Sequence, residues 1–205
     1  MKKVTLNIDG KEIEVQEGMT ILEAAKSVGI NIPTLCYNEK LTPQAACGLC
    51  IVDISKGGKG KLVLSCIYNV EEGLVVKTQT PKLVKHRKML LELMLASSPA
   101  IADLARQYGV DKPRFEDEIS QCVLCGKCVR YCAEVKKANA LTFVGRGINR
   151  KVAFVDEAVS KGVCIDCREC FGLCPTGKLP RETDTVCFDG LTVQDVMFSK
   201  KGKKR

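Results

Sequence analysis

Two cysteine runs constrain the fold of this 205-residue chain more than any other feature. The first, CVLCGKCVRYC, extends from Cys122 to Cys132, and the second, CIDCRECFGLCP, extends from Cys164 to Pro175. Each run places four thiols at successive steps of three, three and four residues. Cysteines at such steps seldom bridge one another in a disulfide framework, whereas metal sites favour this spacing. Both runs are therefore predicted to bind metal.

Iron–sulfur clusters explain these spacings best. A C-x2-C-x2-C segment wraps three soft thiolates around a cubane, and in two-cluster ferredoxins the fourth cysteine of each run binds the other cluster. Carried over to this chain, the pattern predicts two 4Fe–4S clusters, whereas structural zinc leaves the third and fourth cysteines of each run unexplained. The predicted ligand sets are Cys122, Cys125, Cys128 and Cys174 for the first cluster, and Cys164, Cys167, Cys170 and Cys132 for the second.

Four further cysteines, spaced C-x10-C-x2-C-x15-C, predict a 2Fe–2S site. The plant-type spacing begins with C-x4-C-x2-C, so the first loop is longer here, and zinc is a more serious alternative at these positions. Cys187 is predicted to be a free thiol, and the single histidine, His86, to be no ligand because no cysteine is near it in sequence. The predicted 2Fe–2S ligands are Cys36, Cys47, Cys50 and Cys66.

The positive net charge is only weak evidence for a nucleic-acid partner. The formal charge is +8, but five positive charges fall within residues 200–205, leaving +3 for residues 1–199. A bound cluster counted with its thiolates is negative, and aromatic residues for base stacking are few, so we expect no nucleic-acid binding. The most apolar run, residues 89–96, is interrupted by Glu92, and no export signal is recognisable. We therefore expect a cytoplasmic protein without membrane insertion.

Periodicity predicts a small sheet with one helix, followed by two further helices and a hairpin. Alternating apolar residues predict strands around 4–8, 13–15, 51–54, 62–64 and 74–77, with turns at Asp9-Gly10 and KGGKG at 56–60. Helices are expected over residues 20–28, 81–96 and 101–108, with Met89 and Met94 packed in a core. A hairpin is predicted over 141–155 and a short helix near 193–198.

The order of these elements resembles the N-terminal region of the large iron–sulfur subunit of respiratory complex I. It is also similar to iron-only hydrogenases, NAD-dependent formate dehydrogenases and the small diaphorase subunit of NAD-reducing hydrogenases. The resemblance covers about residues 1–180 and is carried by IPTLCY, KHRKMLLELMLASSP, DLARQYGV, QCVLCGKCVRYC and FVGRG. One departure is that Ser98 stands before Pro99 where the family has a histidine, and the segment ASSPAIADLARQYGV that joins the helices contains no cysteine. An additional 4Fe–4S cluster of that family is therefore not expected.

The resemblance implies an α+β chain in four parts. These are a β-grasp 2Fe–2S ferredoxin-like domain over residues 1–79, a helical connector over 80–115 that lacks the family's site of one histidine and three cysteines, a two-cluster bacterial-type ferredoxin domain over 116–180, and an extension with a basic tail over 181–205. No dinucleotide-binding or nucleophile motif is present. The implied role is therefore an electron-transfer subunit of a cytoplasmic NAD(P)-linked flavoprotein complex. A flavin- and NAD(P)-binding subunit and a further redox subunit would be its partners; the alternative is a free-standing soluble ferredoxin-like carrier.

Overall fold

The computed structural model describes residues 2–115, 121–155 and 167–177. The chain folds into two compact units. The first consists of Met1–Tyr37, Pro43–Leu93 and Asp103–Arg114. The second consists of Asn38–Thr42, Met94–Ala102 and Phe115–Arg205. The predicted helix near residues 193–198 and the predicted free thiol Cys187 lie outside the described residues.

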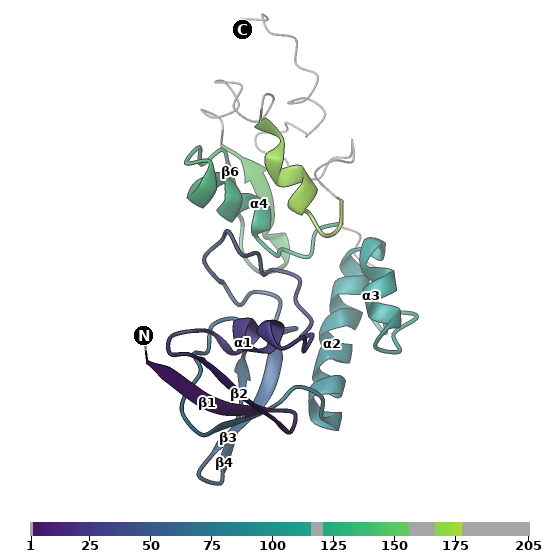
Figure 1. The fold of residues 1–205 in the computed structure, drawn as a ribbon. Coiled ribbons are helices and arrows are strands. Elements are labelled where there is room, and N and C mark those ends of the chain that lie inside the picture. The colour runs from purple at the N-terminus through teal and green to yellow at the C-terminus, as the bar shows by residue number, and fades with distance from the viewer. Residues whose placement is uncertain (1, 116–120, 156–166, 178–205) are drawn as a thin grey trace, which may run out of the picture. The chain divides into compact units, whose positions relative to one another are not determined.

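The first unit is built on a five-stranded sheet with one short helix, as predicted (Figure 1). Its strand order is β2-β1-β5-β3-β4, with β1 and β5 parallel and the other neighbours antiparallel. The two hairpins, β1-β2 and β3-β4, are therefore joined through β5. The strands are β1 Lys3–Ile8, β2 Lys11–Gln16, β3 Ile51–Lys56, β4 Lys59–Leu64 and β5 Leu74–Lys77, and the helix is α1 Ile21–Ser27.

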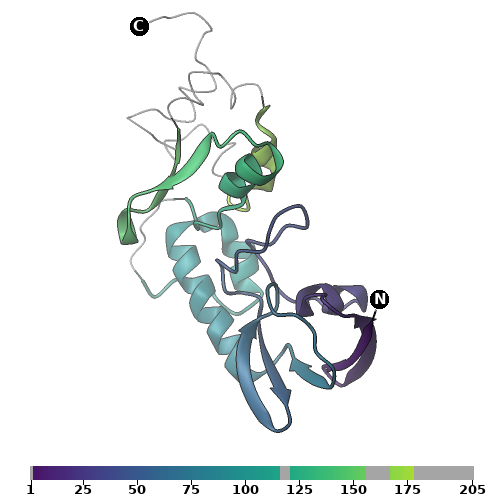
Figure 2. The same ribbon diagram turned by 90° about the vertical axis from the view of Figure 1, so that its left-hand side faces the viewer.

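Both hairpins close with two-residue turns that need left-handed backbone. Asp9 and Gly10 have φ of 50° and 86°, and Gly57 and Gly58 have φ of 58° and 82°. Such turns match the twist of the flanking strands. The turn in the β3-β4 hairpin (Figure 2) places Ile51 opposite Leu64, so the residues just outside both strand ends lie close together.

Capping and apolar periodicity explain both main helices. The Thr20 hydroxyl accepts from the Glu23 backbone N–H, and the Glu23 carboxylate accepts from the Thr20 N–H, which forms the predicted capping box of α1. The second helix, α2 (Pro81–Ser97), begins with Pro81 after Thr80, whose hydroxyl accepts from the Leu83 N–H. A 3-10 turn, Pro99–Ile101, and the short helix α3, Ala102–Arg106, follow α2.

The prediction of core packing for Met89 was wrong. Its side chain is 41% exposed, and its sulfur lies 3.6 Å from an Arg114 guanidinium nitrogen; Met94 is half-buried. The face of α2 that packs inward carries Leu83, Arg87 and Leu91, each fully buried and four residues apart. Met89 projects from a different side of the helix, because successive residues rotate by about 100°.

The second unit contains the predicted hairpin and a short helical segment after Gly126. Strands β6 (Leu141–Val144) and β7 (Lys151–Phe154) pair antiparallel, and α4 (Lys127–Arg130) continues into a π-helical turn, Tyr131–Val135. Within this hairpin, Gly145 has φ of 73°, and a Cβ there would lie 2.3 Å from the Asn149 carbonyl oxygen. The tight turn therefore admits only glycine at this position.

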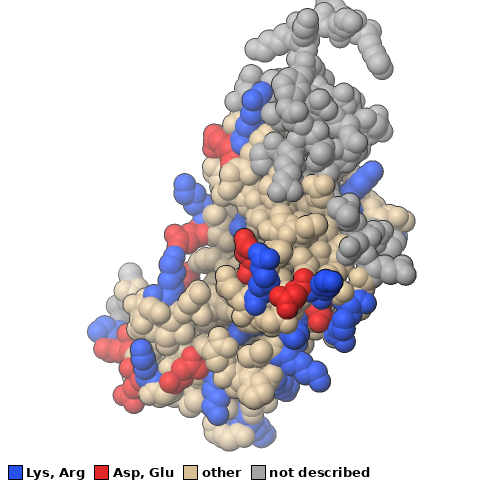
Figure 3. All heavy atoms as spheres, turned by 90° about the vertical axis from the view of Figure 1, so that its right-hand side faces the viewer, with Lys and Arg blue, Asp and Glu red and all other residues tan. Residues whose placement is uncertain are grey.

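Helix apolarity and the distribution of charged side chains also characterise the fold. None of the helices in the described residues has the length and apolarity that crossing a bilayer requires. The face drawn in Figure 3 carries acidic and basic side chains among one another.

Candidate iron–sulfur centres

The four N-terminal cysteines meet at the open end of the β3-β4 hairpin. Cys50 directly precedes β3 and Cys66 follows Leu64 of β4 by two residues, and their sulfur atoms lie 3.4 Å apart. The Cys47 backbone N–H donates to the Cys36 sulfur at 3.5 Å. All four side chains are buried, being at most 5% exposed. The fold thus brings together the four residues predicted as 2Fe–2S ligands.

The backbone of the C-x2-C loop explains why it contains glycine. Gly48 has φ of 70°, and a Cβ at this position would lie 3.0 Å from the Leu90 side chain of α2. A larger residue would both strain the backbone and press against the helix. The loop can therefore turn between Cys47 and Cys50 while it stays packed against α2.

The thiols of the N-terminal cysteines differ in pKa because of hydrogen bonding and burial. The hydrogen bond with Cys36 and then burial raise the pKa of Cys47, and the hydrogen bond with Cys50 and then burial raise the pKa of Cys66. The hydrogen bond with Cys66 lowers the pKa of Cys50 to about 7. Iron, as a cation, would displace the remaining protons and compensate the four thiolates.

Two cavities in the second unit are lined by cysteines from both runs. One is lined by all four residues predicted to bind the first 4Fe–4S cluster, so that Cys174 of the second run joins Cys122, Cys125 and Cys128 of the first. The other is lined by Cys167 and Cys170 of the second run and by Cys132 of the first. The eighth predicted ligand, Cys164, lies outside the described residues. Each cavity is therefore lined by cysteines of one run together with one cysteine of the other run.

Equivalent loop positions in the two runs adopt the same left-handed conformation. Gly126 has φ 71° and ψ 5°, and Arg168, at the corresponding place, has φ 49° and ψ 5°. In both cases the residue precedes a helical turn that carries the third cysteine of its run. A non-glycine residue in this conformation is held there only by its surroundings. The repeated sequence pattern is therefore also a repeated backbone geometry.

The surroundings of the cysteine cavities are apolar with a few polar groups. Val152 lines the first cavity, and Leu141 and Phe171 line the second. Burial is the main cause that raises the pKa of the Cys125 and Cys128 thiols above the ordinary value. A cavity of this kind stabilises thiolates only when a cation accompanies them. The donor set and its environment fit iron–sulfur clusters.

Sequence reasoning missed a hydrogen-bond network beside the second cavity. The Tyr131 hydroxyl donates to the Glu169 carboxylate at 2.8 Å, and the Lys136 ammonium donates to the same carboxylate at 2.5 Å. These bonds, first Lys136 and then Tyr131, lower the pKa of Glu169. Tyr131 and Glu169 each directly precede a predicted ligand, and this adjacency is the signal that could have drawn attention to them.

Two family models match this chain. Residues 1–81 match the 2Fe-2S iron-sulfur cluster binding domain, and residues 121–178 match the 4Fe-4S dicluster domain. The chain carries both domains. The cysteines at the end of the β3-β4 hairpin lie within the 2Fe–2S domain, and the two cysteine-lined cavities lie within the dicluster domain.

Curated relatives with similar sequences are subunits of NAD(P)-linked oxidoreductases, which confirms the predicted resemblance. The 75 kDa subunit of NADH-ubiquinone oxidoreductase from Reclinomonas americana is 32% identical over 86% of this chain and 29% of its own length. NADPH-Fe(3+) oxidoreductase subunit alpha of Geobacter sulfurreducens is 34% identical over 86% of this chain and 24% of its own length. NADP-reducing hydrogenase subunit HndD of Solidesulfovibrio fructosivorans is 31% identical over 87% of this chain and 36% of its own length. The chain thus spans between about a quarter and about a third of these relatives.

A solved structure also resembles this chain. NAD+-reducing [NiFe]-hydrogenase in the H2-reduced state contains a chain that is 27% identical to this one, with a TM-score of 0.66. The match covers 74% of this chain and 75% of that chain.

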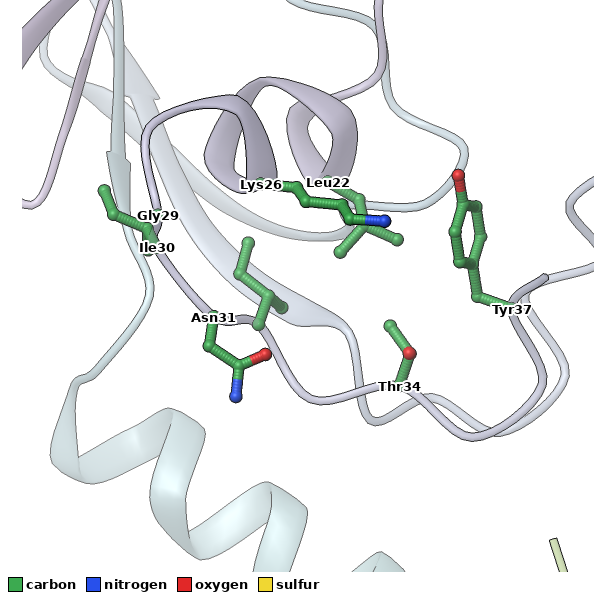
Figure 4. Close-up of a pocket in the computed structure, with 8 residues that line it drawn as sticks. Leu22, Lys26, Gly29, Ile30, Asn31, Thr34 and Tyr37 are labelled. Carbon is green, nitrogen blue, oxygen red and sulfur yellow. The ribbon is translucent and has the colours of Figure 1, made fainter. Parts of the chain in front are cut away.

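One cavity lies apart from the cysteine sites. A cavity of about 320 Å³ beside α1 is lined by residues such as Leu22, Lys26 and Tyr37 and by no cysteine (Figure 4). Among the described residues, no group of three or more His, Cys, Asp or Glu side chains is placed to hold a single metal ion.

Proposed function

We propose that this chain is an electron-transfer subunit that passes single electrons through one 2Fe–2S and two 4Fe–4S clusters within an NAD(P)-linked flavoprotein oxidoreductase complex. The complex would be of the hydrogenase, formate dehydrogenase or bifurcating transhydrogenase type. The exchange of Cys174 and Cys132 between the two cysteine-lined cavities supports this proposal most directly. Such an exchange is what two-cluster ferredoxins use to hold a pair of clusters.

The proposed ligand sets follow the cysteine positions. Cys36, Cys47, Cys50 and Cys66 would hold the 2Fe–2S cluster; Cys122, Cys125, Cys128 and Cys174 the first 4Fe–4S cluster; and Cys164, Cys167, Cys170 and Cys132 the second. When bound, clusters of these types accept and release one electron at a time. The protein would provide thiolate ligands, exclude water by burial and keep both cavities apolar.

The finer domain organisation is also part of the proposal. The strand order and the single helix α1 of the first unit support a β-grasp 2Fe–2S ferredoxin domain over residues 1–79. A helical connector would follow over 80–115, then the two-cluster domain over 116–180 and an extension over 181–205. We propose a cytoplasmic location for the chain.

A flavin- and NAD(P)-binding subunit and a further redox catalytic subunit are the proposed partners. The sequence contains no G-x-G-x-x-G segment and no P-loop, so the nicotinamide would bind elsewhere in the complex. The names of the similar hydrogenase and oxidoreductase subunits support a hetero-oligomer.

Iron analysis tests the proposed cofactors. Protein purified without oxygen is expected to contain about ten irons per chain, from one two-iron and two four-iron centres. Electron paramagnetic resonance after reduction should show signals of both cluster types. About eight irons would contradict the N-terminal 2Fe–2S site, about fourteen would mean that an additional 4Fe–4S cluster is present, and a colourless zinc protein would contradict the whole proposal.

Gentle purification from the native source separates a subunit from a free carrier. A subunit is expected to elute in size-exclusion chromatography together with a flavin-containing protein, with the flavin absorbance following the iron–sulfur absorbance at constant ratio. The chain eluting alone, with its clusters intact at both low and high ionic strength, would instead support the free-standing ferredoxin.

A further inference from the structure

Arg87 is a fully buried cation on α2. Its side chain is 0% exposed, and all three guanidinium nitrogens donate to backbone carbonyl oxygens. Nε donates to Leu49 at 3.0 Å, Nη2 to Ile51 at 2.6 Å and Nη1 to Thr78 at 2.9 Å. Arginine is rarely fully buried unless its charge is paired with another group, because removing an ion from water is strongly unfavourable.

Two of the three acceptors flank a predicted cluster ligand. Leu49 and Ile51 are the residues directly before and after Cys50, which is 1% exposed. The guanidinium therefore holds the backbone on both sides of this cysteine. Its third acceptor, Thr78, is itself fixed, because its backbone N–H and its hydroxyl donate to the Asp9 carboxylate at 2.8 and 2.5 Å. Arg87 thus joins α2 to the ligand loop through an anchored network.

The hydrogen bonds of Arg87 leave its charge without a direct counter-ion. Carbonyl oxygens satisfy the N–H groups but carry no net charge, and within the described residues Arg87 forms no salt bridge. Burial lowers the pKa of the guanidinium, and interactions with Tyr108, Cys50 and Asp9 act in the opposite direction. The cation therefore lies beside the backbone on both sides of Cys50, a predicted cluster ligand.

We propose that Arg87 is the built-in counter-charge of the N-terminal cluster site and a positioning residue for Cys50, and that it raises the reduction potential of the 2Fe–2S cluster. This inference rests on the proposed function. Reduction adds one negative charge to the site, so a fixed cation in a low-dielectric environment stabilises the reduced form more than the oxidised form. A purely structural role, in which Arg87 only attaches α2 to the sheet, would not require this effect on the potential.

Redox titration of the complete holo-protein tests the inference. The potential of the 2Fe–2S signal is followed by electron paramagnetic resonance in the wild type and in three variants, with the 4Fe–4S signals as an internal reference. Arg87→Gln removes the charge, Arg87→Lys keeps it, and Lys85→Gln removes an exposed charge from the same helix. Arg87→Gln is expected to make the cluster about tenfold harder to reduce, a fall of about 59 mV for one electron. Arg87→Lys and Lys85→Gln should stay near the wild-type value.

The measured potentials distinguish a counter-charge role of Arg87 from a purely structural one. An intact cluster with unchanged potential in Arg87→Gln would overturn the inference and leave the proposed function standing. If Arg87→Gln fails to hold the cluster, Arg87→Lys decides, because a retained cluster at the wild-type potential supports the charge and a lost cluster overturns it. A wild-type chain without any 2Fe–2S signal would contradict the proposed function, and the inference with it.

Discussion

Replacing Cys174 with alanine is expected to remove the same 4Fe–4S cluster as replacing Cys125, although the two residues belong to different cysteine runs. Both line one cavity, whereas Cys132 lines the other. Loss of a ligand from a four-thiolate site should lower the iron content from about ten to about six per chain. Anaerobic purification followed by iron and sulfide analysis measures this change.

Double variants make the crossed ligation testable. If Cys125 and Cys174 serve one cluster, replacing both should remove no more iron than replacing either one, because residues that act as a unit have non-additive effects. Replacing Cys125 together with Cys132 should instead lower the content to about two irons per chain, since both 4Fe–4S clusters are then lost. Cys187→Ala is the matched control, and its iron content should equal that of the wild type. Equal losses in the two double variants would contradict the crossed arrangement.

Removing iron is expected to unfold the dicluster domain while the sheet of the 2Fe–2S domain stays folded. The apolar cluster around the sheet of the first unit contains sixteen buried residues, of which Cys50 and Cys66 are cysteines. The apolar cluster around the β6-β7 hairpin of the second unit contains six buried residues, and two of them, Cys132 and Cys170, are cysteines. Metal–thiolate binding contributes on the order of 10 kcal/mol to folding in small metal-dependent domains. The smaller core cannot replace that contribution.

Amide hydrogen exchange measures the two domains in one sample. After chelation under reducing conditions, amides of β6 and β7 should lose protection, whereas those of β1 and β5 should retain it. Reconstitution with iron and sulfide should restore the protection of β6 and β7 and serves as the control. Continued protection of these two strands in iron-free protein would show that the apolar residues alone hold the domain together.

Local elements of this chain were predictable because short stretches of sequence determine them. The Asp9-Gly10 turn, the Thr20–Glu23 capping box and the Pro81 helix start each depend on a few neighbouring residues and appear in the structure as expected. The cysteine spacing likewise indicated the class of cofactor, because ligand steps within one loop are a local property.

Features that depend on contacts between distant segments were not predictable in the same way. The apolar side chain of Met89 was expected in a core, whereas the packing of α2 turns Leu83, Arg87 and Leu91 inward and leaves Met89 exposed. Nothing near Arg87 in sequence indicates that it contacts the backbone beside Cys50, since these residues meet only after the helix docks on the sheet. The left-handed conformation of Arg168 is a further case, because its type does not favour that backbone.

The cysteine spacing, the hairpins and the helix ends could be read from the amino-acid sequence alone, since each is encoded within a few residues. The crossed cysteine pattern had already predicted that Cys174 groups with the first run, and Cys174 lines the same cavity as that run. The buried guanidinium that holds the Cys50 loop, in contrast, became visible only in the folded chain. This difference arises because burial and long-range contacts come from packing the whole chain, which buries apolar area and satisfies hydrogen bonds at the same time.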